Sequence, residues 1–448
     1  MMSLADAASM TGGRASGGNP QFTGVSTDTR TLRSGDLFVA LRGERFDGHA
    51  FLSQAKGGGA SAAMVDRGHQ GEFPLPVIVV EDTKLALGTL ARGWRSLFSP
   101  ALIAVTGSNG KTTVKEMLAA ILRAHAGEHE VLATAGNLNN EIGLPLTLLR
   151  LRERHRWCAI ELGMNHKGEI AYLAGIAQPT VALVNNAQRE HLEFMRTVEE
   201  VAAENASIFD ALPANGVAVI NADDAHAAFF RKAAGKRKVV DFGLDTKASV
   251  SGTYTLNPLS SEIEIRAGGK ARSTLAIPGL HNVRNALAAA ACAFAVGINE
   301  KTICEGLSAF RPYSGRLQVK QAPGGATVID DTYNANPDSV RAAIDVLASC
   351  PGPTALVLGD MGEVGARSAE FHREVGSYAS ARKISRLYAI GEATKHAVEA
   401  FGAGGRHFDS VDELVSGIEG KSILVKGSRF MKMERVVAAL TGAAQGGH

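Results

Sequence analysis

The stretch IAVTGSNGKTTV at 103–114 constrains the fold of this chain more than any other. It opens with apolar and β-branched residues, as a buried strand does, and then turns through Gly107-Ser108-Asn109-Gly110 into Lys111-Thr112-Thr113. The apolar, periodic run over 114–122 predicts that a helix follows. Because loop N–H groups and the positive end of the helix dipole would point at one spot, this unit is expected to hold phosphate. Lys111 adds a charge there, and Thr112 adds a hydroxyl that suits Mg²⁺.

The match to the general phosphate-loop pattern is incomplete, because Val105 stands where that pattern has its first glycine. The alternative is an ordinary strand–helix turn, in which Gly107 and Gly110 serve only to allow positive φ angles. The pair Lys111-Thr112 favours the phosphate loop, since a plain turn requires neither residue.

The size and charge of the chain narrow the function classes. Its 448 residues are enough for about two to four domains. A net charge of +2 and the lack of a basic tract argue against nucleic-acid binding driven by bulk charge. No secretion signal and no 18-residue apolar run occur, so a cytoplasmic protein without membrane insertion is expected. The segments Thr11–Gly13 and Gln445–His448 are expected to be disordered.

The cysteines give no sign of a metal site. All four lie among apolar residues without metal-ligand spacing, at Cys158, Cys292, Cys304 and Cys350. Buried thiols in a reducing compartment are the simplest interpretation.

Residues 1–97 are predicted to form a small α/β domain, with short apolar strands at 37–41, 62–65 and 77–80. Two polar clusters lie in loops beside these strands: STDTR at 26–30 and RGERFDGH at 42–49. Their hydroxyls, N–H groups and arginines could hold a diphosphate or a sugar. Capping of turns by Ser, Thr and Asp explains the clusters equally well.

Residues 98–311 are predicted to form a central domain in which strands alternate with helices around a mainly parallel sheet. Apolar runs at 157–164 and 181–186 are two of its strands; Glu161 lies near the end of the first, and His191 follows the second. In such sheets, ligands gather at the carboxyl ends of the strands, where the phosphate loop also lies. A role as a metal ligand is favoured for Glu161, because a buried strand needs no terminal carboxylate; the alternative is a solvated residue at the edge of the sheet. His191 is explained equally well as a turn residue.

An alanine-rich helix in the same domain opens with IPGLHNVRNA at 277–286. Asn282 and Asn285 are three residues apart and share one helix face, so their amides could read the edge of a base. Spacing alone favours the alternative, in which Asn282 caps the helix and Asn285 faces solvent.

Residues 312–448 begin a new α/β pattern, with strands at 326–331, 355–361, 387–391 and 422–427 that predict a parallel or mostly parallel sheet. The first of these strands ends in Asp330-Asp331 and leads into the polar loop 332–339, which caps a helix over 340–347. After the last strand, Ser428-Arg429-Phe430 offers a cationic turn for an anionic group.

Taken in order, these motifs resemble the Mur ligases, the ATP-dependent amide ligases of peptidoglycan synthesis. The resemblance covers almost the whole chain, and the ordered set of motifs is specific although each motif alone is weak. It is carried by STDTR (26–30), GDLFVAL (35–41), TGSNGKTT (106–113), TAGNLNNEIGLP (134–145), ELGM (161–164), HLE (191–193), GLHNVRNALAA (279–289), DDTYNANPDS (330–339) and LVKGSRFMKME (424–434). The segments DDTYNANPDS and KGSRFMKME are similar to those of the branch that adds D-alanyl-D-alanine to UDP-N-acetylmuramoyl-tripeptide.

The resemblance implies a three-domain Mur ligase fold and an ADP-forming reaction through an acyl phosphate. Residues 1–97 would bind the UDP-sugar, residues 98–311 would form the phosphate-loop ATPase domain, and residues 312–448 would form a Rossmann-like domain for the incoming dipeptide. ATP as co-substrate, two Mg²⁺ ions and a monomeric state are the further expectations.

The resemblance also implies roles for individual residues. Lys111 and the amides of 107–113 would hold the ATP phosphates, Thr112 and Glu161 would bind Mg²⁺, and His191 would help to bind a second Mg²⁺. The other implied nucleotide contacts are Asn282 and Asn285 with adenine, Arg316 with the γ-phosphate and Asp331 with the ribose. The implied substrate contacts are Ser26, Thr27, Arg30, Gly48 and His49 for the UDP-sugar, Asn137 for the muramoyl-peptide, and Asn334, Asn336, Asp338 and Arg429 for the dipeptide.

One segment departs from the family pattern. Many Mur ligases carry a carbamoylated lysine after the HLE motif, and Asn205 stands at that position here. Because an amide cannot become a carbamate, the second metal is expected to use another carboxylate, such as Glu204, or to be held through water. A shifted alignment and a merely solvated helix face are the alternatives.

Three functions therefore compete. The first is the D-alanyl-D-alanine-adding ligase, the second is a related ligase such as one for folate polyglutamylation, and the third is a non-catalytic nucleotide-binding module, which Asn205 suggests. The STDTR and GDLFVAL motifs argue against the second function, and the set Lys111, Glu161, His191 and Arg316 argues against the third. The sequence leaves open whether the third residue of the tripeptide is diaminopimelate or lysine.

Overall fold

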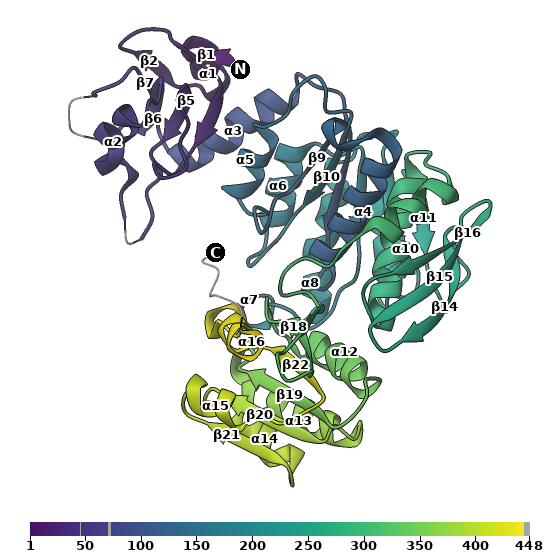
Figure 1. Cartoon of the computed structure of the whole chain (residues 1–448). Helices are drawn as coiled ribbons and strands as arrows, with labels where there is room; N and C mark the ends of the chain where they lie inside the picture. Colours follow the sequence, from purple (N-terminus) through teal and green to yellow (C-terminus); the bar gives the residue numbers. More distant parts are fainter. Residues whose placement is uncertain (45, 70–72, 443–448) are drawn as a thin grey trace.

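The computed structural model describes residues 1–44, 46–69 and 73–442, and the chain forms three α/β units arranged in an open arc (Figure 1). The predicted three-domain α/β fold is confirmed. The expected limits at 97/98 and 311/312 fall between successive large sheets. Arg45 of the second polar cluster and the segment Gln445–His448 lie outside the described residues.

The N-terminal domain is built on a five-stranded sheet in the order β2-β7-β6-β5-β4, which is parallel except for β2. The expected disorder at Thr11–Gly13 is wrong. A capping box between Ser3 and Asp6 starts α1, and Gly12 ends this helix in the left-handed conformation. The elements are β1 (Met2–Ser3), α1 (Leu4–Thr11), β2 (Arg14–Ser16), β3 (Gln21–Phe22), β4 (Gly24–Ser26), β5 (Asp36–Val39), η1 (Gly48–Phe51), α2 (Leu52–Gly57), β6 (Ala62–Asp66), β7 (Val77–Val80) and α3 (Thr83–Arg95).

Helix α3 joins the N-terminal and central domains. Asp82 caps its start by accepting the N–H of Leu85. The apolar face of this helix belongs to the same core cluster as α5 (Gly143–Leu148) and α6 (Glu169–Ala177) of the central domain. The buried guanidinium of Arg95 donates to the carbonyls of Ala177 and Gln178 at the end of α6. The N-terminal domain is therefore anchored through this helix, and Arg152 of the central domain also donates to the Thr23 carbonyl at 2.9 Å.

The central domain contains a six-stranded parallel sheet in the order β13-β12-β11-β8-β10-β9. Strand β8 is flanked by β10 on one side and β11 on the other, so the segments that follow these three strands emerge side by side. The elements are β8 (Ala101–Thr106), α4 (Lys111–Ala126), η2 (Glu128–Glu130), β9 (Val131–Ala133), α5 (Gly143–Leu148), β10 (Trp157–Glu161), α6 (Glu169–Ala177), β11 (Val181–Val184), α7 (Leu192–Met195), α8 (Val198–Ala206), η3 (Ser207–Ala211), β12 (Val217–Asn221), α9 (Ala227–Ala234) and β13 (Lys238–Phe242).

A three-stranded antiparallel sheet follows β13, which the prediction of a mainly parallel domain did not include. It consists of β14 (Ser251–Asn257), β15 (Ser260–Arg266) and β16 (Lys270–Leu275). Helices α10 (Leu280–Ala295) and α11 (Glu300–Ala309) lie between this sheet and α4, and the buried alanines of α10 belong to the core that they share (Figure 1).

The C-terminal domain has a six-stranded sheet in the order β17-β18-β22-β19-β20-β21, in which only β17 is antiparallel. The predicted mostly parallel sheet is confirmed. The elements are β17 (Gln318–Gln321), β18 (Thr327–Asp331), α12 (Pro337–Ala348), β19 (Thr354–Gly359), η4 (Gly365–Arg367), α13 (Ser368–Ala381), β20 (Arg386–Ile390), α14 (Lys395–Phe401), β21 (Gly405–Phe408), α15 (Val411–Gly417), β22 (Ser422–Lys426), η5 (Arg429–Met431) and α16 (Glu434–Thr441).

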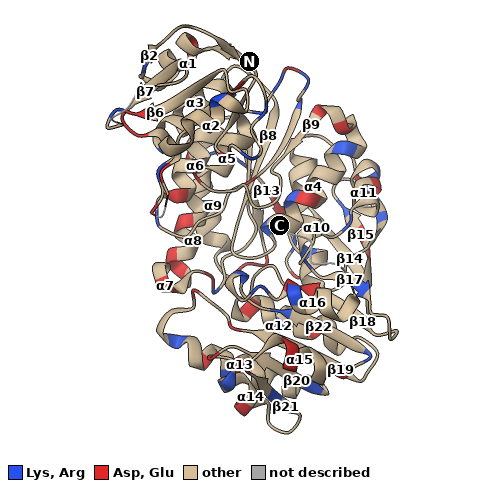
Figure 2. Ribbon diagram, turned by 60° about the vertical axis from the view of Figure 1, so that its left-hand side comes forward, with Lys and Arg blue, Asp and Glu red and all other residues tan. Residues whose placement is uncertain are grey.

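Acidic and basic residues are interspersed over all three domains (Figure 2). Among the helices of the described residues, none combines the length and the apolar character that a membrane-spanning segment requires.

Candidate active site

The phosphate loop lies between β8 and α4 at the carboxyl edge of the central sheet. Gly107 and Gly110 have φ angles of +134° and +84°. A Cβ atom on Gly110 would lie 2.3 Å from Oδ1 of Asn285 and 2.8 Å from Nδ2 of Asn185, so close packing also excludes a side chain there. In the part of the chain that the structure describes, no side chain caps the start of α4, which leaves its first N–H groups available to an anion.

Lys111 is held over this loop. Its Nζ donates to the carbonyls of Gly107 and Ser108 at 2.6 and 3.0 Å and lies 3.3 Å from both carboxylate oxygens of Glu190. Burial opposes ionisation of Glu190, but Lys111 and His191 hold the pKa of this carboxyl below its usual range. The lysine and the glutamate therefore face each other as a charged pair inside the site.

Glu161, the last residue of β10, lies on the other side of the loop. Its Oε1 accepts from the Thr112 hydroxyl at 3.2 Å and from Nδ2 of Asn139 at 2.7 Å, while its buried Oε2 has no hydrogen-bond partner among the described residues. A buried, unpartnered carboxylate oxygen beside a threonine hydroxyl suits a hard cation such as Mg²⁺. No group of three acidic, histidine or cysteine side chains forms a preformed metal cage among the described residues. Such sites commonly take their remaining ligands from substrate phosphates and water.

Arg316 reaches this site from the C-terminal domain. Its Nη2 donates to the Thr112 hydroxyl at 3.3 Å, and its guanidinium stacks on the ring of Tyr333 at 3.9 Å from the centroid. The stacking fixes the direction of a cation that is aimed at the phosphate loop of a different domain.

His191 begins α7 with a φ angle of +53°, in the left-handed region that a non-glycine residue seldom adopts. Its Nδ1 lies 2.7 Å from Oε2 of Glu363, and its Nε2 lies 3.5 Å from Oε1 of Glu190. Burial lowers the pKa of this imidazole, but the two carboxylates outweigh it and raise the pKa to about 9.

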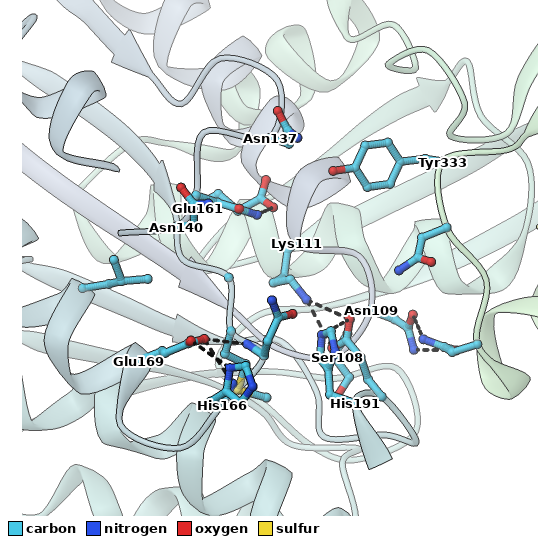
Figure 3. Close-up of a pocket in the computed structure, with 18 of the residues that line it drawn as sticks. Ser108, Asn109, Lys111, Asn137, Asn140, Glu161, His166, Glu169, His191 and Tyr333 are labelled. Carbon is cyan, nitrogen blue, oxygen red and sulfur yellow. Dashed lines mark hydrogen bonds and ion pairs between the residues drawn. The ribbon is translucent and has the colours of Figure 1, made fainter. Parts of the chain in front are cut away.

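The loop and its partners line a cavity of about 620 Å³, to which the central and C-terminal domains both contribute. The described residues on its wall include Lys84 and Leu85 of α3, so the cavity extends toward the N-terminal domain. Of the predicted site residues, it brings together Ser108, Asn109, Gly110, Lys111, Asn137, Glu161, His191, Arg316, Asn334 and Asn336 (Figure 3).

A second cavity of about 470 Å³ adjoins the other side of the loop and is lined by Thr113, Asn282, Asn285 and Asp331. Asn285 donates to Oδ1 of Asn282 at 3.1 Å, and Asn282 donates to the Pro278 carbonyl at 2.7 Å. Both asparagines are buried within α10, whose N-cap is Gly279, so the alternative of a capping Asn282 and a solvated Asn285 is wrong.

Asp331 is paired in this cavity with Lys426, whose Nζ donates to Oδ2 at 2.6 Å. Burial raises the pKa of Asp331, and Lys426 opposes that shift. The N–H of Leu317 also donates to this carboxylate at 3.2 Å.

The N-terminal candidates do not line either of these cavities. Arg30 is exposed and pairs with Asp28 at 2.6 Å, and the Ser26 hydroxyl accepts the N–H of Asp28. The polar groups of the STDTR loop therefore bind one another, and Thr27 lies in the bend of this loop. His49 is buried between Oδ1 of Asp47, at 2.5 Å, and the N–H of Asp66, which donates to its Nε2. A Cβ atom on Gly48 would lie 2.7 Å from the Leu41 carbonyl.

The C-terminal candidates divide into two groups. Asn334 and Asn336 face the cavity, and Nδ2 of Asn336 donates to Oδ1 of Asn109 across the domain boundary at 2.9 Å while its own Oδ1 caps α12. Asp338 is engaged by the Arg189 guanidinium at 2.5 Å, and Arg429 is exposed beside Glu434.

The candidate replacement for the carbamoylated lysine is corrected by the structure. Both oxygens of Glu204 accept backbone N–H groups at the start of α6, from Gly168 and Ile170 at 2.8 Å each. Asn205 is fully buried; it accepts from the Thr106 hydroxyl at 2.8 Å and donates to the Val201 carbonyl. The solvated helix face is therefore wrong, and Glu204 serves as a helix cap.

Sequence reasoning missed Glu190, Asn139, Arg189 and Lys426, which contact predicted site residues. The sequence could have predicted a role for Lys426, because a lysine at the end of an apolar strand needs a buried partner for its charge. Glu190 directly precedes His191 and could have been considered with it.

Fold and cavities together define a three-domain α/β protein in which the cavity at the glycine loop is completed by the C-terminal domain. Three family models match the chain: "Mur ligase family, catalytic domain" over residues 21–95, "Mur ligase middle domain" over 105–293, and "Mur ligase, glutamate ligase domain" over 315–429. The UDP-N-acetylmuramoyl-tripeptide--D-alanyl-D-alanine ligase of Escherichia coli (strain K12) is 42% identical over 438 residues, which cover 96% of each chain. The chain belongs to the Mur ligase family, and it is an ATP-dependent, ADP-forming ligase.

Solved structures agree over nearly the whole length. A crystal structure of MurF from Acinetobacter baumannii superposes with a TM-score of 0.91 at 34% identity, covering 98% of this chain and 99% of that one. MurF ligase from Thermotoga maritima in complex with ADP gives a TM-score of 0.81 at 28% identity, covering 94% and 97%.

Proposed function

We propose that this ligase joins D-alanyl-D-alanine to UDP-N-acetylmuramoyl-tripeptide in the synthesis of peptidoglycan precursors, converting ATP to ADP and phosphate. The observation that carries the proposal is the cavity of about 620 Å³, in which the phosphate loop and Glu161 face Arg316 and the loop from Tyr333 to Asn336. The similarity to the Escherichia coli ligase over 96% of each chain supports this choice of substrates.

The chemistry needs an activated acid, because a carboxylate is a poor electrophile at neutral pH. The terminal carboxylate of the tripeptide attacks the γ-phosphorus of ATP, the bond to the bridging oxygen breaks, and ADP leaves behind an acyl phosphate. The free amine of the dipeptide then attacks the acyl carbon. The C–O bond to phosphate breaks, inorganic phosphate leaves, and the nitrogen loses a proton as the amide forms.

Both steps concentrate negative charge at one place, so a set of fixed cations and N–H groups is what catalysis requires. Lys111, Arg316 and the uncapped N-terminus of α4 converge on the phosphate loop from two domains. We assign the γ-phosphate to Lys111 and Arg316, and the adenosine to the second cavity with Asn282, Asn285 and Asp331.

Mg²⁺ fits the residues on the acidic side of the loop. The free Oε2 of Glu161 and the Thr112 hydroxyl are oxygen donors of the kind it prefers. When bound, the ion offsets the charge of the phosphate oxygens. We also propose that the enzyme is a monomer and acts in the cytoplasm.

The N-terminal domain is proposed to hold the UDP-sugar, with the peptide leading along α3 into the cavity. The reach of the cavity to Lys84 and Leu85 supports that direction. Ser26, Thr27 and Arg30 stay candidate contacts, whereas the packing of Gly48 and His49 favours a role in shaping their loop.

Product analysis tests the proposal. The enzyme is incubated with ATP, Mg²⁺, D-alanyl-D-alanine and UDP-N-acetylmuramoyl-tripeptide that contains either diaminopimelate or lysine. At least one tripeptide is expected to gain the mass of the dipeptide less one water. If neither tripeptide gains that mass although ATP binds, the assignment of substrates is wrong. L-Alanyl-L-alanine serves as the control amine.

A further inference from the structure

Glu190 occupies a central position that no expected role explains. Its side chain is only 11% exposed, its two oxygens lie 3.3 Å from Nζ of Lys111, and Oε1 lies 3.5 Å from Nε2 of His191. It lines the same cavity as Glu161. The two carboxylates thus flank consecutive residues of the phosphate loop, Glu190 at Lys111 and Glu161 at Thr112.

Glu204 and Asn205 supply no anionic oxygen to the Lys111 side of the phosphate loop. The carboxylate of Glu204 is fully used by two backbone N–H groups of α6, and the amide of Asn205 is used by Thr106 and Val201. Neither residue lines either of the two cavities. The only carboxylate in direct contact with both Lys111 and His191 among the described residues is Glu190.

His191 is oriented as a metal ligand would be. Its Nδ1 lies 2.7 Å from Oε2 of Glu363, an ion-pair distance without the geometry of a hydrogen bond, and its Nε2 lies on the side of Glu190. A carboxylate behind the second ring nitrogen is the usual support of a metal-bound histidine, because it fixes the ring and its tautomer. Both His191 and Glu363 have a left-handed backbone, at φ +53° and +59°, a strained conformation that non-glycine residues seldom adopt outside functional sites.

We propose that Glu190 and His191 together hold a second divalent cation beside the nucleotide, with Glu190 supplying the anionic oxygen that Asn205 cannot carry as a carbamate. The inference rests on the proposed function, because nucleotide phosphates and water would complete the coordination of the ion. When nucleotide and cation bind, Lys111 pairs with a phosphate and Glu190 coordinates the cation, so the two side chains no longer pair with each other. Both buried charges stay compensated through the exchange.

The test measures metal binding directly. Mn²⁺ suits carboxylate and imidazole ligands and is paramagnetic, so free and bound ions can be counted by electron paramagnetic resonance. The full chain is titrated with Mn²⁺ in the presence of a non-hydrolysable ATP analogue, without either acceptor or dipeptide. The wild-type chain is expected to bind two ions, and Glu190→Gln is expected to bind one of them at least about tenfold more weakly.

The matched control is Glu193→Gln, which removes the same charge from an exposed residue three positions along the chain. It should keep both ions at wild-type affinity. Binding of the ATP analogue without metal, together with the circular dichroism spectrum, establishes that the Glu190→Gln chain is folded.

Two results would overturn the inference. One is a Glu190→Gln chain that keeps both Mn²⁺ ions at wild-type affinity while binding the analogue more tightly, which would make Glu190 only a competitor for Lys111. The other is a wild-type chain that binds a single ion. Because the titration contains neither acceptor nor dipeptide, its outcome is independent of which acid and amine the enzyme joins.

Discussion

Lys111 and Thr112 are consecutive in the chain, yet each contacts a carboxylate from a different strand end. Lys111 faces Glu190 after β11, and Thr112 faces Glu161 at the end of β10. The parallel order β11-β8-β10 produces this geometry, because it brings the two strand ends to opposite sides of one loop. At the scale of single residues, the site therefore contains buried charged groups that pair with one another, and a bound phosphate would change these pairings.

Lys111→Ala should remove most catalysis while leaving the fold intact. The Lys111 side chain borders the cavity rather than the apolar core, and loss of one fixed donor to a transition-state oxyanion typically costs about 10²- to 10³-fold in rate. Phosphate release and the thermal midpoint are the two measurements. The control is Lys167→Ala, whose exposed side chain pairs with Glu200. Near-native turnover in Lys111→Ala would mean that the phosphate loop has another role.

Individual contacts were harder to predict than the loop itself. The order of apolar, glycine and Lys-Thr residues was enough to place the phosphate loop between a strand and a helix. Asp338 was expected to meet the dipeptide, but it is held by Arg189, which lies 149 positions earlier in the chain. Such a partner is set by how the domains meet, and no local pattern encodes it.

At the scale of elements, helix α6 depends on a distant cap. Gly168 is the N-cap of this helix, with a φ angle of +90°, and it has no side chain that could cap the helix. The N–H groups of Gly168 and Ile170 donate instead to the carboxylate of Glu204 in α8. This contact ties the two helices together behind the site.

Glu204→Gln should therefore lower stability without changing the Mg²⁺ requirement. One carboxylate oxygen is replaced by an amide donor that faces a backbone N–H group, which should cost about 1–3 kcal/mol. Urea unfolding measures the loss, and activity against Mg²⁺ concentration measures the metal requirement. Glu199→Gln, in the exposed first turn of α8, is the matched control. An increased Mg²⁺ requirement with unchanged stability would contradict the capping role.

Strands and helices of the two parallel sheets were predictable because their apolar periods and turn residues are local. The antiparallel β14-β15-β16 sheet was not predicted. Strand β15 does alternate Glu262 and Glu264 with the buried Ile263 and Ile265, but β14 is mostly exposed and has no apolar face of its own. The same applies to α1, which is short and begins at a capping box close to the N-terminus.

At the scale of the whole molecule, the central and C-terminal domains are joined by a charged cluster around Arg189. Its guanidinium pairs with Asp338 and Glu374 and lies over the ring of Phe371, and Arg341 also pairs with Glu374. Arg189 precedes Glu190 and His191 directly, so the cluster holds the segment that carries them against the C-terminal domain.

This cluster should give stability a specific pH dependence. Hydrogen bonds from Arg189 are the main cause that lowers the pKa of Glu374 from 4.5 to about 2. A carboxylate with a depressed folded-state pKa stabilises the fold above its unfolded pKa, and the contribution is lost as the pH falls toward the folded value. Glu374→Gln should therefore be less stable than the wild type at neutral pH, and the gap should shrink below pH 4.5.

Urea midpoints at neutral pH and at several values below 4.5 measure that gap. Glu399→Gln, whose side chain is 74% exposed, should show almost no gap at any pH. A gap for Glu374→Gln that stays constant as the pH falls would show that the Arg189 cluster does not stabilise the fold through this charge.

The most direct test of the ligase assignment is the coupling of phosphate release to both substrates. With ATP and Mg²⁺ present, phosphate release should require both UDP-N-acetylmuramoyl-tripeptide and D-alanyl-D-alanine, and it should equal the amount of peptide product mole for mole. Release that is unchanged when either substrate is omitted, or that proceeds without peptide product, would contradict the account.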